Sequence, residues 1–288
     1  MRLNNTLIVI FLVSFFSQFS FGQRYSVHKK NISYIGFSAG FNFSLPKVKE
    51  HYSILSAEGS SENEDFQKDY DKFGKNKGVQ FGINYSYNFT NSLAIIAGFG
   101  YQTLGFNYFT NYSWVDSVEQ QSLDREMHHL QKVSYFSFPI MMRWDMVKGQ
   151  FMPYLQGGIF MDFRQQGKKE IIYDNTIDEE ETENQTSSSG IAPLTDHIRK
   201  FNMGLSGGIG LNYYLKRVTF GIEANFRYGF LKIINDENRY ADFTGFALPY
   251  LDVMDQLKLS NLNFQFSISV PINHSITLNV LRRKRYSK

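Results

Sequence analysis

Apolar and polar residues alternate one by one along most of this chain. Between Val79 and Phe89 an apolar residue occupies every second position, and Gln, Gly, Asn and Ser fill the positions between them. Because successive side chains of a β-strand point to opposite faces, this period of two predicts a strand with one apolar face. Eight segments show the pattern: 35–44, 79–89, 95–108, 136–145, 151–164, 201–213, 218–230 and 261–270. In the third segment the phase slips near Gly105, which predicts a bulge or a bend.

The connections between these segments fall into two classes that alternate. Three are short (90–92, 147–150 and 215–217), and four exceed 20 residues (46–77, 110–132, 165–200 and 232–258). Tight turns at one end and long loops at the other are typical of outer-membrane barrels. The sequence therefore predicts an all-β fold, an eight-stranded antiparallel up-and-down transmembrane β-barrel with four long extracellular loops.

Composition indicates which face of the barrel points outward. The chain has 28 Phe and 18 Tyr, and aromatic residues make up 17% of it. A soluble barrel of the lipocalin type would place this aromatic face inside and would need a charged exterior. The opposite face carries mostly Gly, Ser, Asn and Gln, which suit the cramped interior of an eight-stranded barrel. The apolar face is nearly free of charge, as contact with lipid requires, and the membrane barrel is the favoured interpretation.

The two ends of the chain differ from the barrel segments. Residues 1–22 combine Arg2, an apolar run and a small-residue ending at Gly22, which predicts a signal peptide cleaved before Gln23. A transmembrane anchor would need about 20 consecutive apolar residues, and polar residues interrupt this run. Residues 23–272 are then the barrel. Residues 273–288 are a basic periplasmic tail that either touches anionic headgroups or peptidoglycan or docks a partner, and its cations more than account for the net charge of +3: Arg282, Arg283, Lys284, Arg285 and Lys288.

A few charged residues fall on the predicted inner face. They are Arg143, Asp145, Asp162, Arg164, Glu223 and Arg227. An unpaired charge in a narrow lumen is costly, so we expect them to form ion pairs that hold neighbouring strands in register. A proton or ion path is the alternative. An eight-stranded barrel leaves no open aqueous channel, so porin activity is not expected.

Six stretches of the barrel segments carry distinctive motifs: YIGFSAGFNFS, INYSYNFTNSLAIIAGFGYQ, YFSFPIMMRW, PYLQGGIFMDF, MGLSGGIGLNYYL and VTFGIEANFRYGF. These motifs resemble those of the Bacteroidota outer-membrane β-barrel family that includes the PorT-like porins. The resemblance covers 34–272. It also includes a Tyr-x-x-x-Pro strand, here Tyr135 and Pro139. The end of the chain departs from the common pattern, because many outer-membrane barrels finish on an aromatic residue in the last strand, whereas here the last strand ends near Ile272. The resemblance implies membership and architecture, and, because one member serves type IX secretion and gliding, it makes a secretion role one possibility.

The predicted loops contain little chemistry. The absence of cysteine excludes zinc–thiolate sites, iron–sulfur clusters and a cysteine nucleophile. The acidic run of 178–183 is interpreted as a solvated, flexible segment, with a divalent-cation site bridging lipopolysaccharide phosphates as the alternative. Adjacent His128 and His129 point apart on a strand and are interpreted as surface residues, and Asp196–His197 is an equally weak signal. No metal, cofactor or catalytic residue is predicted, and no enzyme activity is expected.

Two functions remain open. The first is a structural or surface-interaction barrel in the cell outer membrane, and the alternative is a component of an envelope protein-secretion machine. An outer-membrane lipid-modifying enzyme would need a His and a Ser to meet at the lipid-facing rim, which no spacing predicts. The expected partners are outer-membrane lipid or lipopolysaccharide, the barrel-assembly machinery and other envelope proteins. The near-neutral charge balance argues against nucleic acid.

Overall fold

The computed structural model describes residues 25–52, 68–71, 77–116, 121–147, 149–179, 182–215, 217–240, 252–272 and 277–280. Strands dominate these residues, and the two helices among them are single 3₁₀ turns. The elements are β1 (Tyr25–His28), β2 (Ser33–Glu50), β3 (Asp69–Tyr70), β4 (Lys77–Asn88), β5 (Leu93–Asp116), β6 (Gln121–Asp145), β7 (Phe151–Glu179), β8 (Thr182–Pro193), η2 (Thr195–His197), β9 (Phe201–Tyr214), β10 (Thr219–Lys232), η3 (Asp236–Asn238), β11 (Gln256–Pro271) and β12 (Thr277–Val280). No helix in these ranges is long and apolar enough to cross a membrane.

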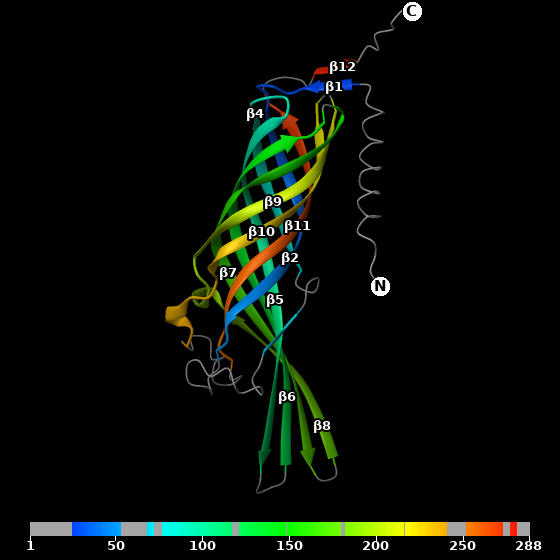
Figure 1. The fold of residues 1–288 in the computed structure, drawn as a ribbon. Coiled ribbons are helices and arrows are strands. Elements are labelled where there is room, and N and C mark those ends of the chain that lie inside the picture. The colour runs from blue at the N-terminus through cyan, green and yellow to red at the C-terminus, as the bar shows by residue number, and fades with distance from the viewer. Residues whose placement is uncertain are drawn as a thin grey trace, which may run out of the picture.

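Eight antiparallel strands close into a barrel (Figure 1). The ring runs β2–β4–β5–β6–β7–β9–β10–β11, and β11 pairs with β2 from Gln256↔Glu50 to Pro271↔Tyr34. The predicted eight-stranded barrel is confirmed. The three short connections β4–β5, β6–β7 and β9–β10 lie at one end of the ring, called here the turn end (top of Figure 1), and the opposite end is called the loop end. Positions nearer the loop end are described as upper or above, and positions nearer the turn end as lower or below. Closure leaves the barrel wall without an unpaired edge, as a lipid environment requires.

The outer surface of the wall carries the apolar face of every barrel strand. Phe81 on β4 and Ile209 on β9 expose 50% and 61% of their surface, whereas Gln80 and Asn212 from the alternate positions are buried inside. Rings also pack across strands on this outer surface, as in the Phe99–Phe138 pair at 5.0 Å between centroids. This belt of Phe, Ile, Leu and Tyr is the lipid-facing surface that the alternation predicts.

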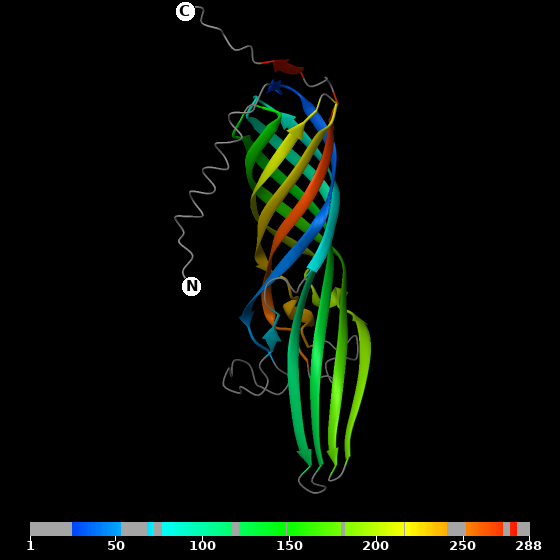
Figure 2. The same ribbon diagram turned by 90° about the vertical axis from the view of Figure 1, so that its right-hand side faces the viewer.

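Beyond the belt, β5, β6 and β7 continue past the loop end and, together with β8, form a protruding sheet (Figure 2). Its order is β5–β6–β7–β8, with pairing that reaches Asp116↔Gln121 and Glu179↔Thr182 at the tips. The prediction of long loops at 110–132 and 165–200 is therefore wrong for most of these residues. They extend the barrel strands as two hairpins because the hydrogen-bonded ladders continue without a break above the belt. Of the acidic run, Asp178, Glu179 and Glu183 lie in β7 and β8, and Glu180 and Glu181 lie outside the described residues.

The predicted bulge near Gly105 is also wrong. β5 and β6 stay in register from Gly100↔Ser137 to Asp116↔Gln121. The apolar residues change face there because the inner side of β5 itself becomes apolar, with Phe106 and Tyr108 fully enclosed. The irregularity lies in β7 instead, where Ser134 pairs with Gln166 and Tyr135 with Arg164, so that Gln165 is an extra residue. Because of this extra residue, the inward-facing residues of β7 are even-numbered below Gln165 and odd-numbered above it, where the protruding sheet begins.

An apolar plug fills the loop end of the barrel. It joins inward-facing side chains of β5, β6 and β11 to residues of the segments that cross the opening, and its members are Leu104, Phe106, Val133, Tyr135, Leu194, Ile198, Ile233, Ile234, Met254, Leu257 and Leu259. A smaller cluster of Ile32, Tyr34, Met152 and Tyr214 lies at the turn end. The lumen is therefore bounded by packed side chains at both ends.

The first and last described strands meet at the turn end. β1 pairs with β12 from Tyr25↔Val280 to His28↔Thr277 as a separate two-stranded sheet (Figure 1). Part of the predicted tail is thus an ordered strand. The predicted signal peptide and the cationic residues of the tail at 282–285 and 288 lie outside the described residues.

Candidate functional site

Two polar regions are candidates for a functional site: the lumen, and a buried charge cluster above it at the loop end. In the lumen, the predicted inner-face charges form two layers. In the lower layer, near the turn end, Arg143 Nε lies 3.3 Å from Asp145 Oδ1, and Lys29, which sequence reasoning missed, pairs with the same carboxylate. Arg143 also donates to Asn88 Oδ1 at 3.3 Å. This layer covers the small apolar cluster of the turn end.

The upper layer centres on Arg227. Its guanidinium lies 2.7 Å from Asp162 Oδ1, donates to Gln102 Oε1 at 2.6 Å and to Ser137 Oγ at 3.0 Å, and stands 3.9 Å from the centroid of the Phe160 ring. These partners come from β5, β6 and β7, and Arg227 itself lies on β10, so a single arginine ties four strands across the lumen. A polar cavity of about 140 Å³ lies between the two layers.

Two of the six predicted inner-face charges have other partners. Glu223 accepts hydrogen bonds from the Tyr154 hydroxyl at 2.6 Å, from Asn225 at 2.9 Å and from Gln156 at 3.1 Å, all of them neutral groups. Arg164 donates to the backbone carbonyls of Thr195 and Ile198 instead of to a carboxylate. Arg164 therefore anchors the segment that carries part of the apolar plug, and it stands at the mouth of the barrel above the upper layer.

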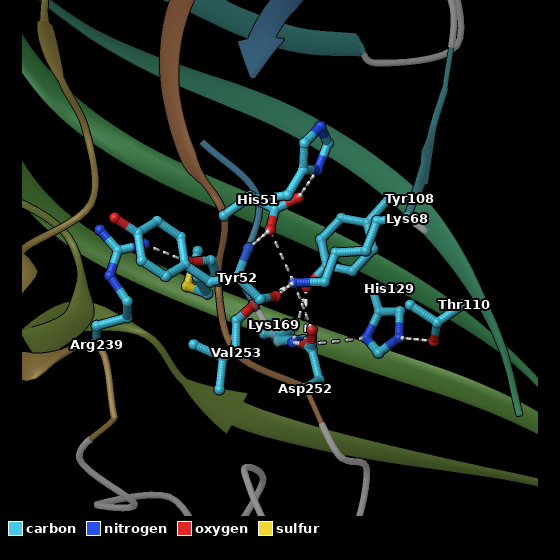
Figure 3. Close-up of polar contacts among 12 residues, drawn as sticks. His51, Tyr52, Lys68, Tyr108, Thr110, His129, Lys169, Arg239, Asp252 and Val253 are labelled. Atoms are coloured by element: carbon cyan, nitrogen blue, oxygen red, sulfur yellow. Dashed lines mark hydrogen bonds and ion pairs between the residues drawn. The ribbon is translucent and has the colours of Figure 1, made fainter. Parts of the chain in front are cut away.

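The second region, here the Asp252 cluster, consists of Lys68, Tyr70, Tyr108, His129, Lys169, Asp252 and Asp255. Figure 3 labels five of them: Lys68, Tyr108, His129, Lys169 and Asp252. Lys169 on β7 pairs with Asp252 Oδ2, and Lys68 lies 3.2 Å from Asp252 Oδ1 and 3.3 Å from Asp255 Oδ1. The Tyr108 hydroxyl donates to Asp252 at 2.8 Å, and the Tyr70 hydroxyl donates to Asp255 at 3.1 Å. The cluster fastens the segment that enters β11 to the inner side of the protruding sheet.

Burial and charge set the protonation of this cluster. Burial alone would raise the pKa of Asp252, but the attraction of Lys169 and Lys68 outweighs it and holds that pKa well below its usual value. Burial raises the pKa of Tyr108 well above the usual value, and the negative charge of Asp252 adds to the effect. Asp252 is therefore ionised and Tyr108 is neutral at physiological pH. With two lysines facing two aspartates, the cluster leaves little net charge for a ligand.

His129 occupies a position that the sequence interpretation placed on the surface. It is fully buried, with Nε2 2.8 Å from Thr110 Oγ1 and Nδ1 3.5 Å from Asp252 Oδ2 (Figure 3). The order hydroxyl, imidazole and carboxylate is the order of a nucleophilic triad. Burial, however, lowers the pKa of His129 to about 3, so that the ring is a weak base. We therefore assign His129 a packing role against the Tyr108 ring, 4.5 Å away between centroids.

Among the described histidines, His51 lies 3.2 Å from Asp255 at the edge of the Asp252 cluster, and His128 and His197 lie outside it. His128 lies on the opposite face of β6 and stacks edge-on against Phe109 at 3.9 Å, as the alternation of a strand dictates. His197, part of the weak Asp196–His197 signal, is buried in η2. Within the described ranges, no three His, Asp or Glu side chains are placed to hold a metal ion.

Comparison with known proteins identifies the family. A family model described as "Outer membrane protein beta-barrel domain" matches residues 13–235. A search of the curated proteins gives no match. Similar solved structures include the Neisserial surface protein A (12% identity, 83% of this chain and 97% of that chain, TM-score 0.34) and OprG from Pseudomonas aeruginosa (13% identity, 85% and 98%, TM-score 0.35). Another is Ail, the attachment invasion locus protein of Yersinia pestis (15% identity, 83% and 99%, TM-score 0.29).

The family match agrees with the geometry described above. It spans well over half of the 288 residues and runs from before β1 to the end of β10. The closed eight-stranded ring with its apolar outer belt is the architecture that such a domain requires. The chain belongs to the outer membrane protein β-barrel domain family, and it is a protein of the cell outer membrane.

Proposed function

We propose that this protein is a non-enzymatic surface-interaction barrel, which holds a rigid protruding sheet outside the cell for contact with other molecules. The observation that carries the proposal is the continuity of β5, β6 and β7 from the barrel wall into that sheet (Figure 2). In outer-membrane barrels the short turns face the periplasm, so the loop end and its sheet face the medium.

The β8 edge of the protruding sheet is the surface that we propose for contact. Among the described residues β8 pairs only with β7, so the outer edge of β8 offers unpaired backbone N–H and C=O groups. The segment Asn184–Ala192 contains no charged residue and no proline, the two features that usually protect an edge strand. Exposed edges of this kind accept an extended segment of a partner as an additional strand.

The lumen favours a contact function over transport. Packed side chains bound it at both ends, the apolar plug at one and the Lys29–Asp145 pair with its apolar neighbours at the other. The cavity of about 140 Å³ between them compares with about 30 Å³ of liquid volume for each water molecule. It is sized for a few waters and is too small for a path that solutes would follow.

Site-specific cross-linking in native outer membranes tests the proposal. The chain has no cysteine, so single variants such as S188C on the β8 edge and R217C in the β9–β10 turn each carry one attachment point. We expect a thiol-reactive cross-linker to join S188C to defined surface partners and R217C to give no matching product. Stable, stoichiometric products from R217C alone would instead support a component of an envelope secretion machine, the role that the PorT-like resemblance suggests. The absence of products from S188C would reject the contact surface.

A further inference from the structure

The lipid-facing wall of the barrel contains an open apolar groove near the turn end. Its volume is about 380 Å³, and its lining includes Met146, Ile209, Leu211, Ile222, Ala224 and Phe264. It lies on β9, β10 and β11 and reaches the residues that flank the β6–β7 turn. The lining also includes Tyr154 and Glu223, which are hydrogen-bonded to each other in the lumen, so the groove extends through the thickness of the wall at this point.

A small side chain between large ones creates the groove. In the sheet register, Ala224 of β10 lies between Ile209 of β9 and Phe264 of β11. Along β10 the neighbouring outward positions are Ile222 and Phe226, whose side chains are 57% and 45% exposed. Ala224 therefore forms the floor of a trough, and the large side chains around it form the walls.

The position of the groove determines what can fill it. It opens within the apolar belt of a protein of the outer membrane, so it faces hydrocarbon. It also lies toward the turn end, which faces the periplasm in outer-membrane barrels. The chains nearest to it are therefore those of the periplasmic leaflet. An apolar cavity of about 150 Å³ is large enough for benzene, so a groove of about 380 Å³ has room for a considerably longer hydrocarbon segment.

We propose that this groove binds one acyl chain of a phospholipid from the periplasmic leaflet. The hydrophobic effect does not favour this position over the bulk membrane, because the chain is in hydrocarbon in both places. Retention comes from dispersion contacts with the walls and floor of the trough, each small and together substantial. A chain seated between Ile209 and Phe264 makes such contacts on three sides, whereas a chain on the convex wall elsewhere makes them on one.

Filling the trough tests the proposal. The variant A224F places a ring on the groove floor, and the matched control A97F places the same ring at an outward-facing alanine of β5 on another part of the belt. Both proteins and the wild type are purified from native outer membranes in a mild detergent, and native mass spectrometry measures bound lipid. We expect phospholipid to stay with the wild type and with A97F, and the bound fraction to fall about tenfold in A224F.

Further measurements separate a folding defect from a lost site. Heat-modifiable migration on an unboiled gel reports whether each barrel is closed, and A224L serves in place of A224F if the larger ring prevents folding. Equal phospholipid retention in wild type and the filled variant would overturn the proposal. So would retention of lipopolysaccharide in place of phospholipid, because lipopolysaccharide belongs to the opposite leaflet.

Discussion

At the scale of single residues, two buried lysines converge on one carboxylate. Lys68 and Lys169 both reach Asp252, and all three side chains are almost completely enclosed. A buried ion pair is not a large source of stability by itself, because desolvation offsets most of the attraction. Its partners depend on each other all the same, since removal of one leaves the others charged and without water.

The variant D252N tests this dependence. The amide keeps the shape of the side chain but leaves Lys68 with Asp255 alone and Lys169 with no carboxylate. We expect the segment 252–257 to lose about 3–5 kcal/mol of local stability, the usual cost of breaking a buried pair. Hydrogen exchange of that segment measures it. The control E50Q removes an exposed pair, Glu50–Lys232, and we expect it to leave exchange unchanged; similar exchange in both variants would contradict a special role for Asp252.

His129 makes the same region sensitive to acid. Its pKa is about 3 in the folded protein and about 6.5 in an unfolded chain, so the unfolded state binds more protons between these values. The stability of the folded cluster is therefore fully present above pH 6.5 and falls as the pH drops toward 3. The charged or titratable groups that act on the ring are Asp252, Lys169, Lys68 and His128. Because the pKa of Asp252 is lowered, protonation of Asp252 adds a further loss of stability only below the usual aspartate pKa of 3.8.

The variant H129Q tests this dependence of stability on pH. Glutamine can still bond to Thr110 but does not titrate, so we expect its local opening to change less between pH 7 and pH 4.5 than that of the wild type. Hydrogen exchange of β5 and β6 near Thr110, corrected for the intrinsic pH dependence, gives the comparison. An equal pH response in the two proteins would show that another group controls the acid sensitivity.

At the scale of the strands, the bulge at Gln165 determines which side chains of β7 enter the Asp252 cluster. Below the bulge the even-numbered residues such as Asp162 face inward, and above it the odd-numbered residues Gly167, Lys169 and Ile171 do so. Deletion of Gln165 alone removes the extra residue and leaves Arg164 and Gln166 as neighbours opposite Tyr135 and Ser134, so both parts of β7 are expected to keep their faces. Deletion of Gln165 and Gln166 together is expected to reverse the upper part of β7, because a further shift of one residue exchanges the two faces of a strand. Lys169 would then turn away from Asp252.

Cysteine labelling detects such a reversal. In the native chain, I171C is expected to be protected from a water-soluble thiol reagent, whereas E170C is expected to react, since Ile171 is buried and Glu170 is exposed. In the variant without Gln165 and Gln166 we expect the two reactivities to exchange, whereas in the control variant without Gln165 alone we expect them to stay as in the native chain. Unchanged reactivities in the double deletion would mean that the strand absorbs the change elsewhere, for example by sliding the β7–β8 hairpin.

The strands also show where prediction from the sequence succeeds and where it stops. The barrel segments are predictable because each has lipid on one face and a polar lumen on the other, which imposes a strict period of two. Above the belt that contrast disappears: consecutive Lys168, Lys169 and Glu170 continue a strand in which both faces carry charge. The alternation therefore ends before the strands do. The phase slip at Gly105 was misread for a related reason, because the inner face meets an apolar plug there.

The Asp252 cluster lay beyond such prediction altogether. Lys68, Lys169 and Asp252 come from three different predicted loops, and no spacing in the sequence relates them. They meet only because closure of the barrel brings β7 and β11 around the same opening and β5 pairs with β3 next to Lys68. The lumen charges were easier to predict, since the alternation of inward and outward positions along each strand alone places them on the inner face. The alternation does not reveal that Arg164 binds backbone carbonyls instead of a carboxylate.

At the scale of the whole molecule, the filled lumen predicts a barrel that does not conduct. Purified protein inserted into a planar bilayer is expected to give no stepwise ion current, because the apolar plug closes the loop end and the Lys29–Asp145 layer closes the turn end. The variant R227A removes the upper polar layer but neither closure, so it is expected to remain silent as well. Migration on unboiled and boiled gels verifies that each sample is a closed barrel. Regular current steps from the folded wild type would contradict the sealed lumen and would favour a transport function over surface contact.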